Sequence, residues 1–352
     1  MSQETMTPRE RWTTVLDGGT PDRVPTDYWA TSEATDRLLN HLGLDTLEQA
    51  RAELHIDPLL IVGGRYTGPR IPENEDVFGC RFEKVNYGTG TYRECIHNPL
   101  AEYDTVEEID DNYTWPDPDW WSYDHLPEQI KGRDDLPVRG GGSEPFLIYK
   151  RLRGMEQGMM DLALNPDIVH YCLDHLFDLA CESTRRIFEQ IPDRVLISYV
   201  AEDLGGQEGL LISRERIKEF LLPRMKRMMD LVHQAGAYVF THTDGAVRDV
   251  LPDLIEAGTD VLNPIQWRCP GMEREGLKRD FGDDLVFHGA VDNQYTLASG
   301  SVDEVRKEVR HNIRILGRGG GYILAPCHNI QSVSPPENIV AMYETAWREG
   351  WY

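Results

Sequence analysis

Residues 237–265, AYVFTHTDGAVRDVLPDLIEAGTDVLNPI, contain the pattern that decides the fold. Ala237–Thr241 and Val261–Ile265 are short runs rich in Val, Leu, Ile or aromatic residues, as is typical of buried parallel strands. Between them, Val247–Ala257 has the apolar spacing of an amphipathic helix and is followed by Gly258, a residue type favoured at helix C-termini. Two strands joined by such a helix form a βαβ unit, so we expect them to pair in parallel.

The same alternation extends through most of the chain. Further strands are predicted at Arg23–Ala30, Pro58–Gly63, Val138–Gly140, Val195–Val200, Leu285–Gly289 and Gly321–Ala325. Helices are predicted at Ser32–Leu42, Thr46–Glu53, Ser213–Ala235, Met272–Phe281, Ser301–Leu316 and from Pro145 onward. Because no Gly-rich dinucleotide fingerprint follows the first strand, these eight strand candidates favour a (β/α)8 TIM barrel over a Rossmann sheet. We therefore predict a single barrel domain over residues 1–352, with a β-hairpin excursion near residues 79–96.

Composition excludes several classes of protein. The 352 residues include 60 acidic and 36 basic side chains, and the resulting net charge of −24 would repel a nucleic-acid backbone. No run of about 18 apolar residues is present, so no membrane span is expected. The six cysteines are scattered without a paired framework, and the first residues are polar, unlike a secretory signal. We expect a cytoplasmic protein with reduced thiols that binds neither nucleic acid nor membrane.

Polar side chains follow the predicted strands at the points where the strands end. The carboxyl ends of barrel strands converge on one mouth, where catalytic residues usually lie. Residues spread over 130 positions of sequence should therefore meet in one pocket. They are Glu202, Asp203, His242, Asp244, Asn263, Gln266, His288, Asp292, Cys327, His328 and Asn329.

His242 and Asp244 lie two residues apart on an extended segment, so their side chains should leave on the same side. Such a pair can ligate a metal, or the carboxylate can orient the imidazole as a base; the alternative is a histidine hydrogen-bonded within a polar core. His328 would supply a third ligand from the last strand. Cys327 precedes it, and only one of these two neighbours should face the pocket unless the chain turns there. Glu202 and Asp203, by contrast, share a structural alternative, in which they interact with a helix dipole or pair with an arginine.

Five stretches make the chain resemble the uroporphyrinogen decarboxylase superfamily, which includes the corrinoid-linked methyltransferases. Its opening helix and turn are similar to Thr7–Val24, and its "PF…G…P" region to 144–169. Its "DDLG…SP…F…P" block is similar to Ala201–Pro223, AEDLGGQEGLLISRERIKEFLLP. His242–Gly245 matches the family's His-x-Cys-Gly element, and Pro326–Asn338, PCHNIQSVSPPEN, its closing "P.EN" element. The resemblance implies the barrel fold and an enzyme.

The resemblance also bears on the reaction. Uroporphyrinogen decarboxylases hold their polycarboxylate substrate with an R-x-A-G-R element, which the comparable stretch Asp27–Arg37, DYWATSEATDR, lacks. The methyltransferase branch uses zinc held by a His, a Cys and a late Cys. Here Asp244 replaces the first Cys, and the late ligand falls at His328, with Cys327 one residue earlier. Imidazole and carboxylate ligands suit zinc, but also Mn or Fe(II).

We therefore expect a metal-dependent methyltransferase that passes a methyl group between a small O- or N-methylated substrate and a corrinoid protein. The alternative is a decarboxylase of a tetrapyrrole or other polycarboxylate, and a catalytically silent binding barrel is a third class. The expected roles are metal binding by His242, Asp244, His328 and Cys327, catalysis by Glu202, Asp203 and His288, and substrate binding by Asn263, Gln266, Asp292 and Asn329.

Overall fold

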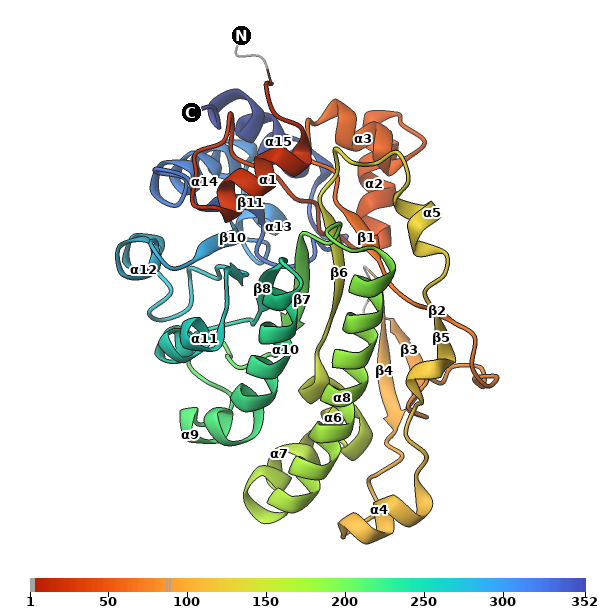
Figure 1. The fold of residues 1–352 in the computed structure, drawn as a ribbon. Helices are drawn as coiled ribbons and strands as arrows, with labels where there is room; N and C mark the ends of the chain where they lie inside the picture. Colours follow the sequence, from red (N-terminus) through yellow and green to blue (C-terminus); the bar gives the residue numbers. More distant parts are fainter. Residues whose placement is uncertain (1–3, 87, 89) are drawn as a thin grey trace.

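A curled parallel sheet forms the centre of the computed structural model, which describes residues 4–86, 88 and 90–352 (Figure 1). Its seven strands follow sequence order and every pairing is parallel. Across the sheet they are β1 (Leu60–Val62), β6 (Val138–Ser143), β7 (Ile197–Ala201), β8 (Tyr238–His242), β9 (Val261–Asn263), β10 (Val286–Val291) and β11 (Tyr322–Pro326). The α/β class and the order of these strands agree with the prediction.

The predicted first strand, Arg23–Ala30, is not a regular strand. Thr26 forms an isolated parallel bridge with Leu324 of β11, which places this segment beside the last strand of the sheet. On its other side, the Thr26 amide donates to Asp57 Oδ2 at 2.9 Å, and the Asp57 amide donates to Thr26 Oγ1 at 3.1 Å. Within the described residues, no backbone ladder joins this segment to β1. The side chain of Asp57 therefore bridges the seam, by which we mean the gap between residues 23–30 and β1.

Asp57 is held at the seam by two buried arginines. Its Oδ1 lies 2.5 Å from Arg11 Nη1 and 2.9 Å from Arg23 Nη2. All three side chains are at most 3% exposed, so the guanidiniums compensate a carboxylate that water cannot reach. Breaking such a buried group by removing one partner typically costs about 3–5 kcal/mol.

The helices lie outside the sheet, mostly where their patterns predict them (Figure 1). Those bearing on the predicted ranges are α2 (Ser32–Leu42), α3 (Leu47–Glu53), α6 (Pro145–Arg153), α9 (Arg214–Arg216), α10 (Leu222–Gln234), α11 (Leu251–Ala257), α12 (Arg274–Phe281) and α14 (Val302–Ile315). The others are α1 (Pro8–Leu16), α4 (Val106–Asn112), α5 (Leu126–Ile130), α7 (Met155–Leu164), α8 (Pro166–Gln190), α13 (Thr296–Ser299) and α15 (Pro336–Glu349).

The segment predicted as one helix over Ser213–Ala235 is interrupted. A π-helical turn, Ile217–Leu221, separates α9 from α10. Pro223 lies in the first turn of α10 and has no N–H to donate to the preceding turn, so a regular α-helical hydrogen bond is missing there. Proline within the predicted range is thus the physical reason for the break.

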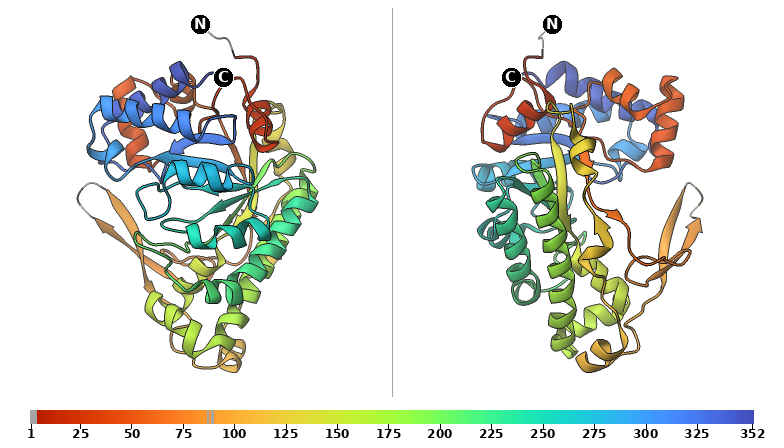
Figure 2. Two further views of the ribbon diagram at one scale, coloured as in Figure 1. Left: turned by 90° about the vertical axis from the view of Figure 1, so that its left-hand side faces the viewer. Right: turned by 45° about the vertical axis from the view of Figure 1, so that its right-hand side comes forward.

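The predicted hairpin is present as β3 (Arg81–Asn86) paired antiparallel with β4 (Thr91–His97). It projects from the rest of the molecule (Figure 2). A second small sheet joins β2 (Arg65–Tyr66) to β5 (Trp121–Ser122). In the part of the chain that the structure describes, no helix combines the length and the apolar character that crossing a membrane would need.

Helix α1 closes the amino-terminal end of the curled sheet. Its Trp12 and Val15 are fully buried in a cluster with Ile197, Phe240 and Ile323, which lie in or near the first half of their strands. The interior at that end is therefore filled with apolar side chains. The polar interior positions are left at the opposite, carboxyl end of the strands, and the site lies there.

Candidate metal centre

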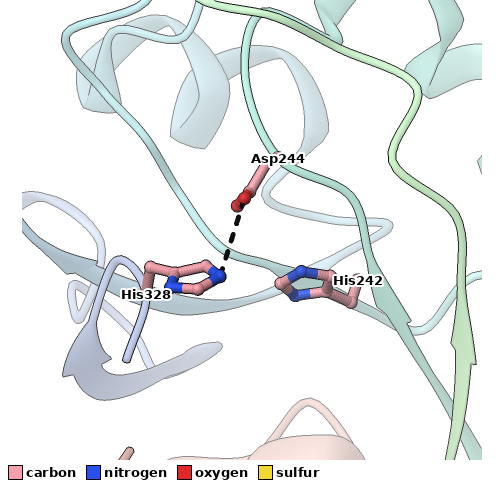
Figure 3. A group of neighbouring side chains, drawn as sticks. All are labelled: His242, Asp244 and His328. Atoms are coloured by element: carbon pink, nitrogen blue, oxygen red, sulfur yellow. Dashed lines mark ion pairs between the residues drawn. The ribbon is translucent and has the colours of Figure 1, made fainter. Parts of the chain in front are cut away.

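Three potential metal ligands meet at the carboxyl ends of β8 and β11. His242 is the last residue of β8, Asp244 follows two residues later, and His328 lies two residues beyond β11. One ligand atom from each lies within 4.8 Å of the others, and among residues 4–86, 88 and 90–352 this is the only such group found. Figure 3 shows the three side chains pointing toward one another, with His328 Nε2 3.9 Å from Asp244 Oδ2.

The donor set fits a divalent transition metal. Two imidazoles and one carboxylate, with an open fourth position, are typical of catalytic zinc sites. Bonds of about 2.0–2.2 Å to one tetrahedral ion would place two ligand atoms about 3.4 Å apart, so the 3.9 Å between His328 and Asp244 is slightly wider than one ion requires. A fourth donor is near, because Asp203 Oδ1 is buried without a hydrogen-bond partner and lies 3.8 Å from His242 Nε2.

The imidazole of His288 lies below this group and is neutral. The side chain is fully buried, and burial lowers its pKa. Its Nε2 is 3.1 Å from Asp27 Oδ2. Burial opposes ionisation of Asp27, but the hydrogen bond from His288 and the charges nearby hold the pKa of this carboxyl below its ordinary value. Since a carboxylate only accepts, the single ring proton of His288 resides on Nε2.

This proton position fixes the orientation of Asn263 and, through it, the tautomer of His242. With Nε2 protonated, His288 Nδ1 accepts, and Asn263 Nδ2 donates to it at 2.7 Å. The other amide atom, Asn263 Oδ1, then accepts from His242 Nδ1 at 2.5 Å. His242 Nε2 therefore carries a lone pair directed to the mouth, which is the state that a metal ligand requires.

Asp244 is positioned by Gln266, whose Nε2 donates to Asp244 Oδ1 at 2.9 Å and whose Oε1 accepts from the Gly245 amide at 2.9 Å. Burial and the neighbouring carboxylates of Asp203 and Glu144 raise the pKa of Asp244, although His242 and His328 act in the opposite direction. A cation at the mouth would relieve the repulsion among these carboxylates. Gln266, which was predicted to bind substrate, thus hydrogen-bonds to the predicted metal ligand Asp244.

Glu202 and Cys327 are turned away from the group. Both Glu202 carboxyl oxygens accept from the Phe146 amide at the start of α6, at 2.8 and 3.1 Å. Burial raises the pKa of Glu202 well above its ordinary value. The Cys327 thiol is buried, its pKa is raised by burial, and its Sγ donates to Ile265 O at 3.1 Å. Of the neighbouring pair Cys327 and His328, His328 lies in the ligand group.

Two residues predicted to bind substrate lie in different surroundings. Asp292 is buried, forms an ion pair of 2.7 Å with Arg268, and accepts from the amides of Tyr295 and Thr296, so its carboxylate is occupied by the protein. Asn329, which follows His328, lines a pocket of about 400 Å³.

Several residues beside His242 were not predicted from the sequence. The ring centroids of Trp29 and Tyr199 lie 6.0 and 5.6 Å from that of His242. Tyr199 also donates to Glu144 Oε1 at 2.7 Å. Only Arg139 could have been singled out from the sequence. It lies within the predicted strand Val138–Gly140, and a charged residue inside a buried strand needs an explanation.

The comparisons with known proteins agree with this architecture. Residues 84–348 match the family described as Uroporphyrinogen decarboxylase (URO-D). Two curated uroporphyrinogen decarboxylases, from Anaeromyxobacter sp. (strain Fw109-5) and Anaeromyxobacter dehalogenans (strain 2CP-C), are each 24% identical over 283 residues, which cover 77% of this chain and 75% of the relative. A solved methyltransferase from Methanosarcina mazei has the same fold, with a TM-score of 0.70 and 18% identity over 97% of this chain and 99% of that one.

Parallel strands curled around a polar interior, with a His/Asp/His group at their carboxyl ends, define an α/β enzyme. More particularly, the chain belongs to the uroporphyrinogen decarboxylase family, because the match to that family spans most of its length. The resemblance predicted from the sequence is thereby confirmed.

Proposed function

We propose that this enzyme is a metal-dependent methyltransferase that moves a methyl group between a small O- or N-methylated molecule and a corrinoid protein. The observation that carries the proposal is the convergence of His242, Asp244 and His328, with the lone pair of His242 Nε2 directed at the same space. The fold shared with the Methanosarcina mazei methyltransferase supports the same branch of the superfamily.

The three ligands would hold zinc or a related divalent ion, which as a Lewis acid would withdraw electrons from the oxygen or nitrogen that carries the methyl group. Asn263 keeps the lone pair of His242 available, and Gln266 orients Asp244. Asp203, with its unpartnered buried oxygen, is the carboxylate placed to exchange a proton with the demethylated atom. The rings of Trp29 and Tyr199 form an aromatic wall beside His242 against which the substrate would pack.

Metal analysis of the purified protein tests the proposal. We expect about one transition-metal ion per chain. A His242→Ala variant should lose it, because one of three protein ligands is gone. Methyl transfer from a methylated substrate to a corrinoid should require the bound ion. The change in corrinoid absorbance measures this transfer. A metal-free protein with full activity would contradict the metal-dependent mechanism.

The second candidate is a decarboxylase, which the two curated relatives favour. Incubation with uroporphyrinogen separates the two functions, since only the decarboxylase releases CO2. The missing R-x-A-G-R element leads us to expect no release.

Three further expectations belong to this proposal. We infer that the bridge at Thr26 and the seven strands together act as a (β/α)8 barrel. We propose that residues 1–352 form one domain. We also place the enzyme in the cytoplasm, where its six free cysteines would remain reduced.

A further inference from the structure

A pocket of about 400 Å³ opens at the seam, and two of its lining residues adjoin the candidate metal centre. One wall comes from residues 27–30, and the facing wall from Leu59, which precedes β1, and from Ile61 within β1. The two residues that adjoin the metal centre are Asn329, which follows His328 in the sequence, and Tyr199, whose ring centroid lies 5.6 Å from that of His242. The volume is at the small end of the roughly 300–1,000 Å³ found for small-molecule sites.

Two arginines line this pocket without a carboxylate hydrogen-bonded to either of them. Among the described residues, neither Arg51 nor Arg139 has a hydrogen-bond or ion-pair partner for its side chain, and Arg51 Nε is buried. The Arg139 guanidinium lies over the rings of Trp29 and Tyr199, 5.7 and 5.4 Å from their centroids. These contacts hold the guanidinium in place while leaving its N–H groups without acceptors.

The nearby carboxylates do not accept hydrogen bonds from these arginines, although the charge of Arg139 contributes to the lowered pKa of Asp27. Asp27 lines the same pocket, but its carboxylate already accepts from the Tyr28 amide, Trp29 Nε1 and His288 Nε2. Glu144 accepts from the Tyr199 hydroxyl. A partly buried guanidinium without an acceptor is costly, and an incoming anion would supply one.

We propose that the seam pocket binds a carboxylate on the methyl donor, with Arg139 as its principal contact and Arg51 adding positive charge from α3. The inference rests on the proposed function and narrows its substrate to methylated carboxylic acids. The carboxylate lies at Arg139, the body of the molecule packs against Trp29 and Ile61, and the methylated oxygen or nitrogen reaches His242 and His328. Ile61 is 55% exposed, so a ligand would cover apolar surface that the protein leaves open.

Calorimetric titration of the full-length protein with benzoate and with benzamide tests the anion site without any methyl transfer. The two probes have the same shape and differ in charge, so benzoate should bind at least about 10-fold more tightly. Arg139→Met should weaken benzoate binding by about 10- to 100-fold and leave benzamide unchanged. Arg139→Lys should restore part of the loss, because lysine keeps the charge but not the planar fork.

Arg318→Met is the matched control, because it removes the same charge from an exposed arginine preceding β11, at the opposite end of the strands. It should leave benzoate binding unchanged. Equal affinity for the two probes, undetectable benzoate binding at millimolar concentration, or an unaffected Arg139→Met variant would each overturn the proposal.

A transfer assay separates this inference from the function on which it rests. 4-Methoxybenzoate and methoxybenzene are offered as donors to cob(I)alamin, and methylation is followed by absorbance. Transfer from both at equal rates, unchanged in Arg139→Met, would refute the carboxylate site and leave the methyltransferase intact. Benzoate binding that depends on Arg139, without transfer from either donor, would support the site and count against the methyltransferase.

Discussion

Replacing Asn263 by leucine should weaken zinc binding although Asn263 is not itself a metal ligand. The amide is 1% exposed and joins two buried rings, at 2.5 Å from His242 Nδ1 and 2.7 Å from His288 Nδ1. Leucine has a similar shape but neither donates nor accepts. The Asn263→Leu variant would therefore leave His242 free to adopt the other tautomer, in which Nε2 carries the proton and cannot bind a metal.

The size of the effect follows from these two hydrogen bonds. Loss of a contact that orients a ligand typically lowers metal affinity by about 10- to 100-fold, equivalent to about 1.4–2.7 kcal/mol. Each buried polar group left without a partner costs about 1–3 kcal/mol, so the metal-free protein should lose about 2–6 kcal/mol of stability. Asn263→Leu thus lowers both zinc affinity and the free energy of unfolding.

Competition with a chromophoric chelator measures the zinc affinity, and denaturation in the presence of EDTA measures the stability. The matched control is Thr241→Val, which removes a buried hydrogen bond of 2.8 Å to Thr259 from the residue next to His242. It should reduce stability by about 1 kcal/mol and leave zinc affinity unchanged. Equal zinc affinity in the wild type and Asn263→Leu would refute the argument that Asn263 fixes the tautomer of His242.

Three further outcomes are expected. In zinc titrations, Cys327→Ser should retain wild-type zinc affinity and His328→Ala should lower it at least about 10-fold, because only His328 lies in the His242, Asp244 and His328 group. A larger loss of affinity in Cys327→Ser would show that Cys327 faces the metal instead. Trp12→Ala should lower the free energy of unfolding by about 3–5 kcal/mol in urea denaturation, because the indole is fully buried at the amino-terminal end of the sheet. A loss below about 1 kcal/mol would mean that α1 does not close the amino-terminal end of the sheet. Asp22 is partly buried against Arg11, and although burial acts in the opposite direction, the hydrogen bond from Arg11 lowers its pKa from 3.8 to about 2. A lowered pKa stabilises the folded state above pH 3.8, and the contribution disappears as the pH falls toward 2. Because solvent screens part of this interaction, Asp22→Asn should cost about 1 kcal/mol at pH 7 and progressively less below pH 4 in denaturant titrations. A pH-independent difference would contradict the assigned ion pair.

Periodicity predicted most of the fold because strands and helices leave local signals. The runs at Ala237–Thr241 and Val261–Ile265 match β8 and β9 within a few residues, and the helix between them is α11. The predicted strand at Arg23–Ala30 has the right composition, and its place beside β11 is consistent with a barrel. Its irregularity could not be predicted, because it depends on the buried Asp57 side chain, which takes the Thr26 amide at the seam.

The sequence by itself determined that polar residues follow the strands, and parallel strands necessarily bring those ends to one edge. It placed His242, Asp244 and His328 there, and the structure brings these three within ligand distance of one another. Only the tertiary structure decided what the others do. Glu202 meets the start of α6, and Cys327 turns toward Ile265, since side-chain direction after a strand depends on how the loop bends.

The contacts of Asp27 and Arg139 also depended on the tertiary structure. Asp27 lies 261 residues before His288, and neither residue carries a motif that marks the hydrogen bond between them. Arg139 is distinguished by the absence of a hydrogen-bonding or ion-pair partner, which can be recognised only when every neighbouring side chain has been placed. Local patterns of polarity in the sequence predict the order of the strands. Proton positions and unpaired polar groups depend instead on packing between residues far apart in the sequence, and it is they that govern what the site can bind.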